Sequence, residues 1–222
     1  MRFPTYPTSY FSKALRYFAP VPFGFFGEAP PCALDARAQA IITAARDQSV
    51  PPGTRAVQVV RSIIQTYYPS QAGKVANVVY NDPIPGLQTQ RNGSGPAATG
   101  TINVGRYFLD HIANFARRVL QTGHELVHIE QYRQKMTDQT EREFLAHCWT
   151  ALMPEIQGTG CVRPGDRLGS ADCALRFWNC LSPQKQTQYT QHQQTLLTLR
   201  QSLKATTPLP ASCNRDEIRR TC

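Results

Sequence analysis

A short motif, His124-Glu125-Leu126-Val127-His128, places two imidazoles four residues apart with a carboxylate between them. On an α-helix, residues four apart lie on one face, a turn from each other, so both histidines can bind one metal ion. Glu125 then lies at the edge of the same site, where it can take a proton from a water held by the metal. The motif predicts one zinc ion, with His124 and His128 as ligands and Glu125 as the general base.

The sequence around the motif predicts a long helix from Tyr107 to about Gln134. Apolar residues recur at helical spacing on both sides of the histidines. They are Phe108, Ile112, Phe115, Val119, Leu126, Val127 and Ile129. An H-E-x-x-H motif that occurs by chance usually lies in a polar or proline-broken stretch, so this setting favours a metal site.

A catalytic zinc ion normally takes three protein ligands and a water, so the two histidines need a partner. The next predicted helix runs from Gln139 to about Met153, with Thr137 or Asp138 as its N-cap. It offers Glu141 and Glu143. These two lie about 200° apart around a helix, so only one of them can face the metal.

The apolar face of this helix favours Glu141. The residues that define the face are Phe144, Leu145, Cys148 and Leu152. In projection Glu141 falls within this face, whereas Glu143 and His147 fall on the opposite side. A carboxylate on a buried face is costly unless it is paired or binds a metal. Glu141 is therefore the predicted third ligand. The alternatives are Asp172, which follows a glycine turn, and Glu143, alone or with His147.

The motif and the next helix together resemble the gluzincin pattern, in which H-E-x-x-H is followed by a helix with E-x-x-x-D or E-x-x-A-D. Here His124-Glu-Leu-Val-His128 is followed by Glu141-Arg-Glu-Phe-Leu-Ala. The run from Glu141 to Pro154 is also similar to the second helix of ImmA/IrrE-type peptidases, which often ends in Leu-Met-Pro. Within that pattern the first glutamate is the ligand. The sequence departs from the pattern at Leu145, where an Asp or Asn is usual, and in the short link between His128 and Glu141.

The wider stretch from about Lys74 to Pro154 is similar to the metallopeptidase toxin domains of bacterial type VI secretion spike proteins and other polymorphic toxins. The resemblance implies a zinc-dependent peptidase that is secreted as an antibacterial effector and often acts in the periplasm. It implies a protein or peptide substrate, with a secretion apparatus or an immunity protein as a further partner. The alternatives are a zinc amidase on peptidoglycan stem peptides and a non-catalytic binding module with structural zinc.

Such a mechanism needs a strand that holds the substrate and a donor that stabilises the oxyanion. The candidate strand is Thr101–Gly105, with Ile102, Asn103 and Val104 at its centre. The candidate donors are Tyr189 and His192, three residues apart on a late helix, although a polar helix surface is the simpler explanation of this Gln- and Thr-rich segment. We expect Tyr132 to contribute packing, and His111 and His147 to be ordinary surface histidines.

The sequence pattern predicts the elements that position these residues. They form an α+β fold, mainly helical, with a small antiparallel sheet before the motif helix. The predicted strands are 74–80, 86–91 and 99–105. The further predicted helices are 33–47, 54–68, 170–181 and 183–204, with a loop at 158–169. We expect residues 32–222 to form one domain with a cysteine-rich helical C-terminal part.

Composition limits which ligands the protein binds and the compartment in which it acts. The chain has 222 residues and a formal net charge of +9, but its basic residues are scattered, so we expect no nucleic-acid ligand. No run reaches the roughly 20 apolar residues of a membrane span. Seven cysteines predict two or three disulfides and an oxidising compartment. Residues 1–31 are rich in aromatics and prolines and lack a secretory signal pattern, so we expect an extended segment there.

Overall fold

The computed structural model describes residues 32–204 of the chain. Its helices are α2 (Ala36–Arg46), α3 (Pro52–Tyr67), α4 (Pro69–Ala72), α5 (Phe115–Arg133), α6 (Gln139–Leu152), α7 (Pro164–Asn179), α8 (Pro183–Gln188) and α9 (Thr190–Lys204). Its strands are β1 (Val75–Tyr80), β2 (Leu87–Asn92) and β3 (Thr99–Val104). This arrangement confirms the predicted α+β, mainly helical fold with a small sheet before the motif helix. The predicted aromatic segment, residues 1–31, lies outside the described residues.

The sheet has the strand order β1-β3-β2 and is mixed rather than purely antiparallel. Strand β3 pairs in parallel with β1 and in antiparallel with β2, so Ile102 lies opposite both Val78 and Thr89. Burial explains the order. Ile102 and Val104 are fully buried, so β3 takes the centre, whereas the more exposed β1 and β2 form the edges. The prediction of an antiparallel sheet is therefore wrong for the β1–β3 pair.

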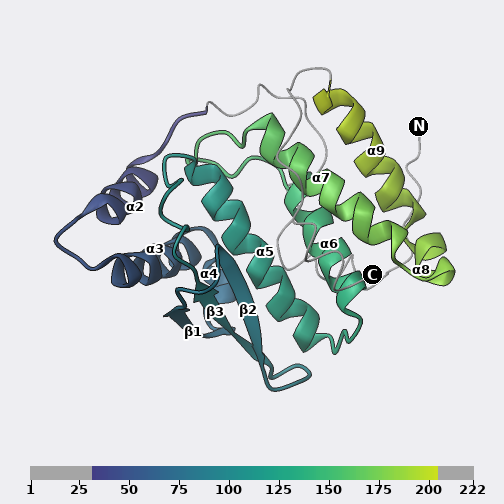
Figure 1. The fold of residues 1–222 in the computed structure, drawn as a ribbon, viewed down its shortest axis with the longest axis horizontal. Coiled ribbons are helices and arrows are strands. Elements are labelled where there is room, and N and C mark those ends of the chain that lie inside the picture. The colour runs from purple at the N-terminus through teal and green to yellow at the C-terminus, as the bar shows by residue number, and fades with distance from the viewer. Residues whose placement is uncertain (1–31, 205–222) are drawn as a thin grey trace. The chain divides into compact units, whose positions relative to one another are not determined.

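Helix α5 lies between two groups of elements (Figure 1). The sheet and α3 lie on one side, and α6 lies on the other, with α7 and α9 beyond it. Packing on both sides explains why α5 buries residues around most of its circumference. Helix α5 begins at Phe115, not at the predicted Tyr107. Phe108 and Ile112 are buried, but they belong to a series of turns that fills the core without forming a helix.

Two other predicted boundaries differ from the structure. Helix α7 begins at Pro164, within the predicted loop 158–169, because proline is well suited to a first helical turn. The predicted helix 183–204 is divided at Tyr189 into α8 and α9. The N-cap of α6 is Asp138, whose side chain accepts a hydrogen bond from the Glu141 amide at 3.1 Å.

A disulfide joins Cys32 to Cys161, 129 residues later in the chain. It ties the segment before α2 to the loop before α7, where Leu34 and Thr159 also form a β-bridge. Such a bond fits an oxidising compartment. Among the described residues, Cys148 is the free cysteine, and it is buried. No helix within residues 32–204 has the length and apolar character that a membrane crossing requires.

Candidate metal and catalytic site

Helices α5 and α6 bring His124, His128 and Glu143 together. The two Nε2 atoms of the histidines are 3.2 Å apart. The Glu143 Oε2 atom lies 3.5 Å from the His128 Nε2 and 3.9 Å from the His124 Nε2. All three ligand atoms fall within 4.8 Å of one another, and the three side chains are only 8–14% exposed. Two nitrogens and one oxygen thus converge on a single point between the helices.

A hydrogen-bond chain on α6 fixes the orientation of His124. The Thr150 hydroxyl lies 2.9 Å from the Ala146 carbonyl oxygen and 3.0 Å from the His124 Nδ1. Because the carbonyl can only accept, the hydroxyl donates its single proton there and accepts from the imidazole Nδ1–H. The proton of a neutral His124 is therefore on Nδ1, and its Nε2 lone pair faces the point of convergence.

A glutamine fixes His128 in the same way. The Gln131 Nε2 donates to the Arg142 carbonyl oxygen at 2.9 Å, which turns the Gln131 Oε1 toward the His128 Nδ1 at 2.9 Å. The His128 Nδ1–H therefore donates to Gln131. Ligand histidines in metal sites commonly donate their second ring nitrogen to an oxygen in this manner. Neither Thr150 nor Gln131 was predicted from the sequence, although Thr150 lies two turns from Glu143 on the same side of α6.

Without a cation, the two Nε2 lone pairs would face each other, close to a carboxylate. Burial lowers the pKa of His124 well below its usual value, with the neighbouring His147 and His128 adding to the effect. Burial also opposes charge on His128, but the Glu143 carboxylate outweighs it and raises the pKa of His128 to about 9. Burial raises the pKa of Glu143, yet the two histidines hold it at about 2. In the metal-free protein, a proton on the His128 Nε2 thus occupies the place that suits a metal ion.

We expect the His128 imidazole of the metal-free protein to remain protonated up to about pH 9. Because the pKa of His128 lies above its usual 6.5 and the pKa of Glu143 lies below its usual 4.5, the Glu143–His128 pair stabilises the metal-free fold fully between about pH 4.5 and 6.5. The contribution is lost as the pH rises through about 9. A pH titration of the His128 ring signals by NMR measures this pKa directly. Glu143→Gln should lower it clearly, since only Glu125 and Gln131 then oppose the effect of burial, and an unchanged pKa in that variant would refute the assignment.

Glu125 lies beside the three converging residues and is buried at 8% exposure. The Thr89 hydroxyl of β2 lies 2.8 Å from the Glu125 Oε2 and 3.1 Å from the Glu125 backbone oxygen. Burial raises the pKa of Glu125, while His128 and the Thr89 hydrogen bond act in the opposite direction. A carboxylate with a raised pKa is a better proton acceptor, so its environment suits the predicted role of general base.

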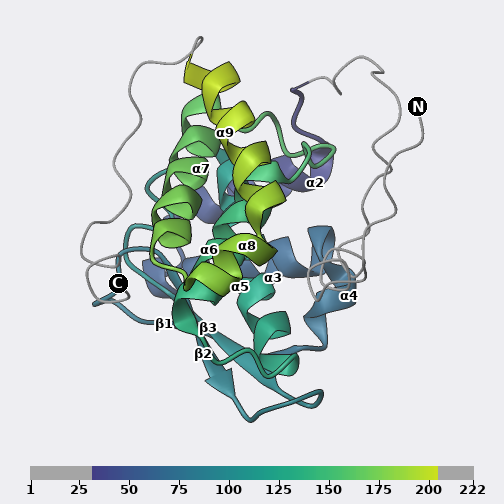
Figure 2. The same cartoon turned by 90° about the vertical axis from the view of Figure 1, so that its right-hand side faces the viewer.

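Glu141, the predicted third ligand, is bonded elsewhere. Its carboxylate accepts a hydrogen bond from the Tyr189 hydroxyl at 2.6 Å and forms an ion pair with Lys185 at 2.8 Å. Lys185 also pairs with Asp138, so these contacts join the start of α6 to α8 and the residue that follows it. Figure 2 shows α8 against this part of α6. The prediction is corrected: Glu143, weighed as an alternative, faces the histidines, and Glu141 binds the C-terminal helices.

The projection failed because α6 has two buried faces rather than one. Helix α6 packs against α5 on one side and against α7 and α9 on the other. The predicted apolar face, with Phe144 and Cys148, is directed toward the C-terminal helices. The α5 face carries Glu143, His147 and Thr150. A polar residue opposite an apolar stripe is exposed only when the helix lies at the surface. The projection assumed such a helix and therefore placed Glu143 in solvent.

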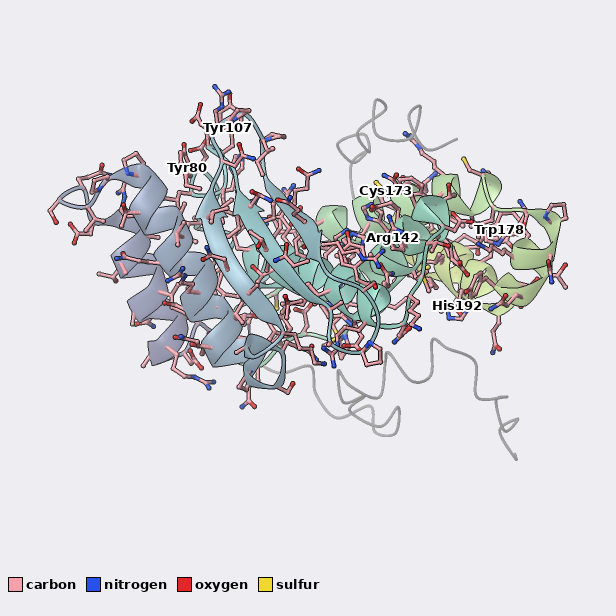
Figure 3. All side chains as sticks on the ribbon, turned by 90° about the horizontal axis from the view of Figure 1, so that it is seen from below. Tyr80, Tyr107, Arg142, Cys173, Trp178 and His192 are labelled. Carbon is pink, nitrogen blue, oxygen red and sulfur yellow. A yellow bond between two sulfur atoms is a disulfide. The ribbon has the colours of Figure 1, made fainter. Side chains whose placement is uncertain are left out.

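Three other predicted site residues lie away from the histidines. The Tyr189 hydroxyl is committed to Glu141, and burial together with that carboxylate raises the pKa of Tyr189. His192 packs edge-on against the Tyr189 ring, and Figure 3 places it among the C-terminal helices, away from the sheet. Asp172 pairs with Arg200 on α9 at 2.6 Å. The structure therefore supports neither Tyr189 and His192 as oxyanion donors nor Asp172 as a ligand.

His147 is not the surface residue that the sequence suggested, whereas His111 is exposed as expected. The His147 ring centre lies 4.8 Å from that of His124, and its other face stacks on Phe177 at 5.6 Å. Burial lowers the pKa of His147 to about 3, so the ring is neutral. Its Nδ1 is buried without a hydrogen-bond partner among residues 32–204. The His147 ring thus packs directly against the ring of His124.

The predicted substrate strand is also corrected. Residues Ile102, Asn103 and Val104 belong to β3, whose backbone pairs with β1 on one side and β2 on the other. A central strand has no free hydrogen-bonding edge for a peptide. Among residues 32–204, the unpaired sheet edge nearest the site belongs to β2, because Thr89 on this strand contacts Glu125 directly. Helix α5 packs along β2, so this edge borders the candidate site.

Gly123 allows α6 to approach the first ligand histidine. A Cβ atom at this position would lie 2.6 Å from the Tyr68 hydroxyl and still closer to the Trp149 ring. Both neighbours are buried, and the Tyr68 hydroxyl donates to the Val119 carbonyl oxygen at 2.9 Å. The absence of a side chain just before His124 therefore lets Trp149 pack against α5.

We expect Gly123→Ala to lower the free energy of unfolding by about 1–3 kcal/mol, as overpacking of a filled core usually does. Urea denaturation measures the change. Gly169→Ala is the matched control, because a methyl group there meets open space within helix α7. Alanine favours a helix over glycine, so this control should gain about 0.5–1 kcal/mol. Equal effects of the two substitutions would contradict the close packing at Gly123.

Comparison with known proteins adds no family to this description. No protein-family model matches the chain, no curated protein is similar to it, and no solved structure resembles it. The functional interpretation therefore rests on the residues of the candidate site.

Proposed function

We propose that this protein is a zinc-dependent peptidase, with His124, His128 and Glu143 as ligands of one zinc ion and Glu125 as the general base. The observation that carries the proposal is the pair of histidine Nε2 atoms 3.2 Å apart, each with its Nδ1 committed to another acceptor. Two lone pairs held face to face beside a carboxylate form a site for a cation.

The donor set suits zinc, which favours imidazole nitrogens and a carboxylate oxygen. Three protein ligands are also the number found in catalytic zinc sites, which keep one position for water or substrate, whereas structural sites use four. When bound, zinc lowers the pKa of a coordinated water toward about 7 and polarises a substrate carbonyl.

The remaining steps belong to the protein's own residues. Glu125 accepts the proton of the attacking water and passes it to the leaving amine, and the Thr89 hydroxyl holds its carboxylate in place. The free edge of β2 can bind an extended peptide through backbone hydrogen bonds, which is a common mode of peptide recognition. Glu125 and the peptide would then meet at the same strand.

We further propose that the peptidase is a secreted antibacterial effector. The Cys32–Cys161 disulfide supports the first part, because such bonds persist outside the reducing cytosol. The second part carries forward the expectation drawn from the motif and the helix that follows it, and no matching family or curated protein supports it. Production of the protein in the bacterial periplasm should slow growth, and production of the Glu125→Gln variant there should not.

The test of the peptidase function combines metal analysis with hydrolysis. We expect one zinc ion per chain and cleavage of peptides in a proteome-derived library, followed by mass spectrometry. Removal of the metal by 1,10-phenanthroline should abolish cleavage, and one equivalent of zinc should restore it. A protein that binds zinc but cleaves no peptide would be either a zinc amidase, which hydrolysis of peptidoglycan stem peptides would reveal, or a binding module with structural zinc. A protein that binds no zinc would exclude all three functions.

A further inference from the structure

A tyrosine close to the candidate site has two arginines near its ring. The Arg91 guanidinium carbon is 5.9 Å from the centre of the Tyr132 ring, and that of Arg142 is 5.4 Å from it. Both distances are within the range of cation–π attraction. Three separate elements therefore contribute to the cluster: Arg91 comes from β2, Tyr132 from α5 and Arg142 from α6.

The cluster is directly connected to the proposed catalytic residues. Tyr132 lies one helical turn after His128, and its hydroxyl is 3.5 Å from the Thr89 carbonyl oxygen. Arg142 immediately precedes Glu143 in α6, and its charge helps to lower the pKa of that carboxyl. Arg91 lies two residues after Thr89, so both side chains project from the same face of β2. Figure 3 shows Arg142 between the sheet and the C-terminal helices.

Among the described residues, neither arginine has a carboxylate in direct contact. Within residues 32–204, no carboxylate forms an ion pair with Arg91 or Arg142. Their hydrogen bonds go to main-chain carbonyl oxygens instead. Arg91 donates to Gly93, and Arg142 donates to Met136 and Thr137. These bonds and the Tyr132 ring hold both side chains in place before any ligand arrives, which lowers the entropy cost of binding an anion.

We propose that Arg91 and Arg142 bind a carboxylate of the substrate close to the bond that is cleaved, so that the enzyme prefers acidic peptides. The inference rests on the proposed peptidase function and specifies its substrate class. Guanidinium groups bind carboxylates through paired, charge-assisted hydrogen bonds. The carboxylate comes either from an Asp or Glu side chain or from the C-terminus of the peptide, and the two sources predict different cleavage patterns.

The first experiment compares a proteome-derived peptide library with the same library after amidation of all its carboxylates. Cleavage of the amidated library should be about tenfold slower, since one charge-assisted hydrogen bond contributes about that factor. In the native library, enrichment of Asp and Glu at one position identifies a side-chain carboxylate. Cleavage at a fixed distance from the C-terminus identifies the terminal carboxylate. Equal cleavage of both libraries overturns the proposal.

The variants Arg91→Gln and Arg142→Gln test the two residues. Each should reduce the preference for acidic over amidated peptides by about tenfold, with the zinc content unchanged. Arg61→Gln is the control, because it removes the same charge from α3, where Arg61 bonds to Asn77. It should keep the preference. If all three variants behave alike, net charge rather than a specific subsite attracts the peptides. Arg91 is exposed, so Arg91→Gln remains informative even if Arg142→Gln, which loses bonds at the α5–α6 turn, unfolds.

A binding measurement separates this inference from the proposed function. The immobilised, zinc-loaded Glu125→Gln protein is exposed to the native library, and the retained peptides are identified. Enrichment of acidic peptides that disappears with Arg91→Gln supports the subsite even if the wild-type protein cleaves nothing. Cleavage by the wild-type protein without any acidic preference supports the peptidase and overturns the subsite.

Discussion

Replacing Glu143 by Gln is expected to abolish zinc binding, whereas replacing Glu141 by Gln should leave it intact. Glu143 supplies the oxygen that faces both histidines, at 3.5 Å and 3.9 Å from their Nε2 atoms. Loss of a ligand should weaken zinc binding by more than the roughly 10- to 100-fold that loss of an outer hydrogen-bond partner causes. Titration with a competing zinc chelator of known affinity measures both variants.

Glu141→Gln should lower the free energy of unfolding more than Glu143→Gln does, which is the reverse of their effects on zinc binding. Glu141→Gln removes the charge that binds Lys185 and Tyr189, so we expect a loss of about 1–3 kcal/mol in the free energy of unfolding. In the metal-free protein Glu143→Gln loses the ion pair with His128 on α5, whereas Glu141→Gln loses two contacts that join α6 to Lys185 and Tyr189. Zinc should stabilise wild type and Glu141→Gln against urea and should not stabilise Glu143→Gln. The reverse pattern would restore Glu141 as the ligand.

The parts of the site that could be predicted from the sequence are those that depend on one helix. His124, Glu125 and His128 lie within five residues, so helical spacing alone determines which side chains share a face. The same reasoning located α6 and limited its N-cap to Thr137 or Asp138, of which the structure shows Asp138, because capping depends only on the first turn. These local rules need no knowledge of neighbouring elements.

The parts that failed depend on what packs around an element. The choice between Glu141 and Glu143 required the knowledge that α6 is covered on both sides, and an apolar stripe does not show a second buried face. The central place of β3 depends on a parallel pairing with β1 that the order of strands along the chain does not reveal. Thr150 and Gln131 have no signature of their own, because any polar residue at those positions can reach solvent in another fold.

The Cys32–Cys161 bond illustrates the same limit. Five of the seven cysteines lie in the last third of the chain, but the sequence alone does not show which cysteines are paired. The Cys32–Cys161 disulfide joins residues 129 apart, because the chain before α2 returns to the loop before α7. Pairing of cysteines depends on this return, which only the tertiary structure provides.

Replacing Glu125 by Gln is expected to reduce kcat/KM by about 10²- to 10⁴-fold, the usual contribution of a positioned general base. Zinc should remain bound, because Glu125 is not one of the three converging ligands. The variant should also be at least as stable as the wild type. Burial raises the pKa of Glu125, so the charged carboxylate is costly in the fold, and the neutral amide still accepts the Thr89 hydrogen bond.

In Glu125→Gln, the zinc content and the urea stability should therefore be at least those of the wild type, while the cleavage rate falls. Glu141→Gln is the matched control, because it makes the same chemical change in a buried carboxylate outside the site and should lose stability while keeping cleavage. A Glu125→Gln protein that binds zinc and cleaves peptides at the wild-type rate would remove Glu125 from the mechanism. Because the same variant is expected to fold at least as well as the wild type, a loss of cleavage in it can be assigned to the missing proton acceptor rather than to a damaged site.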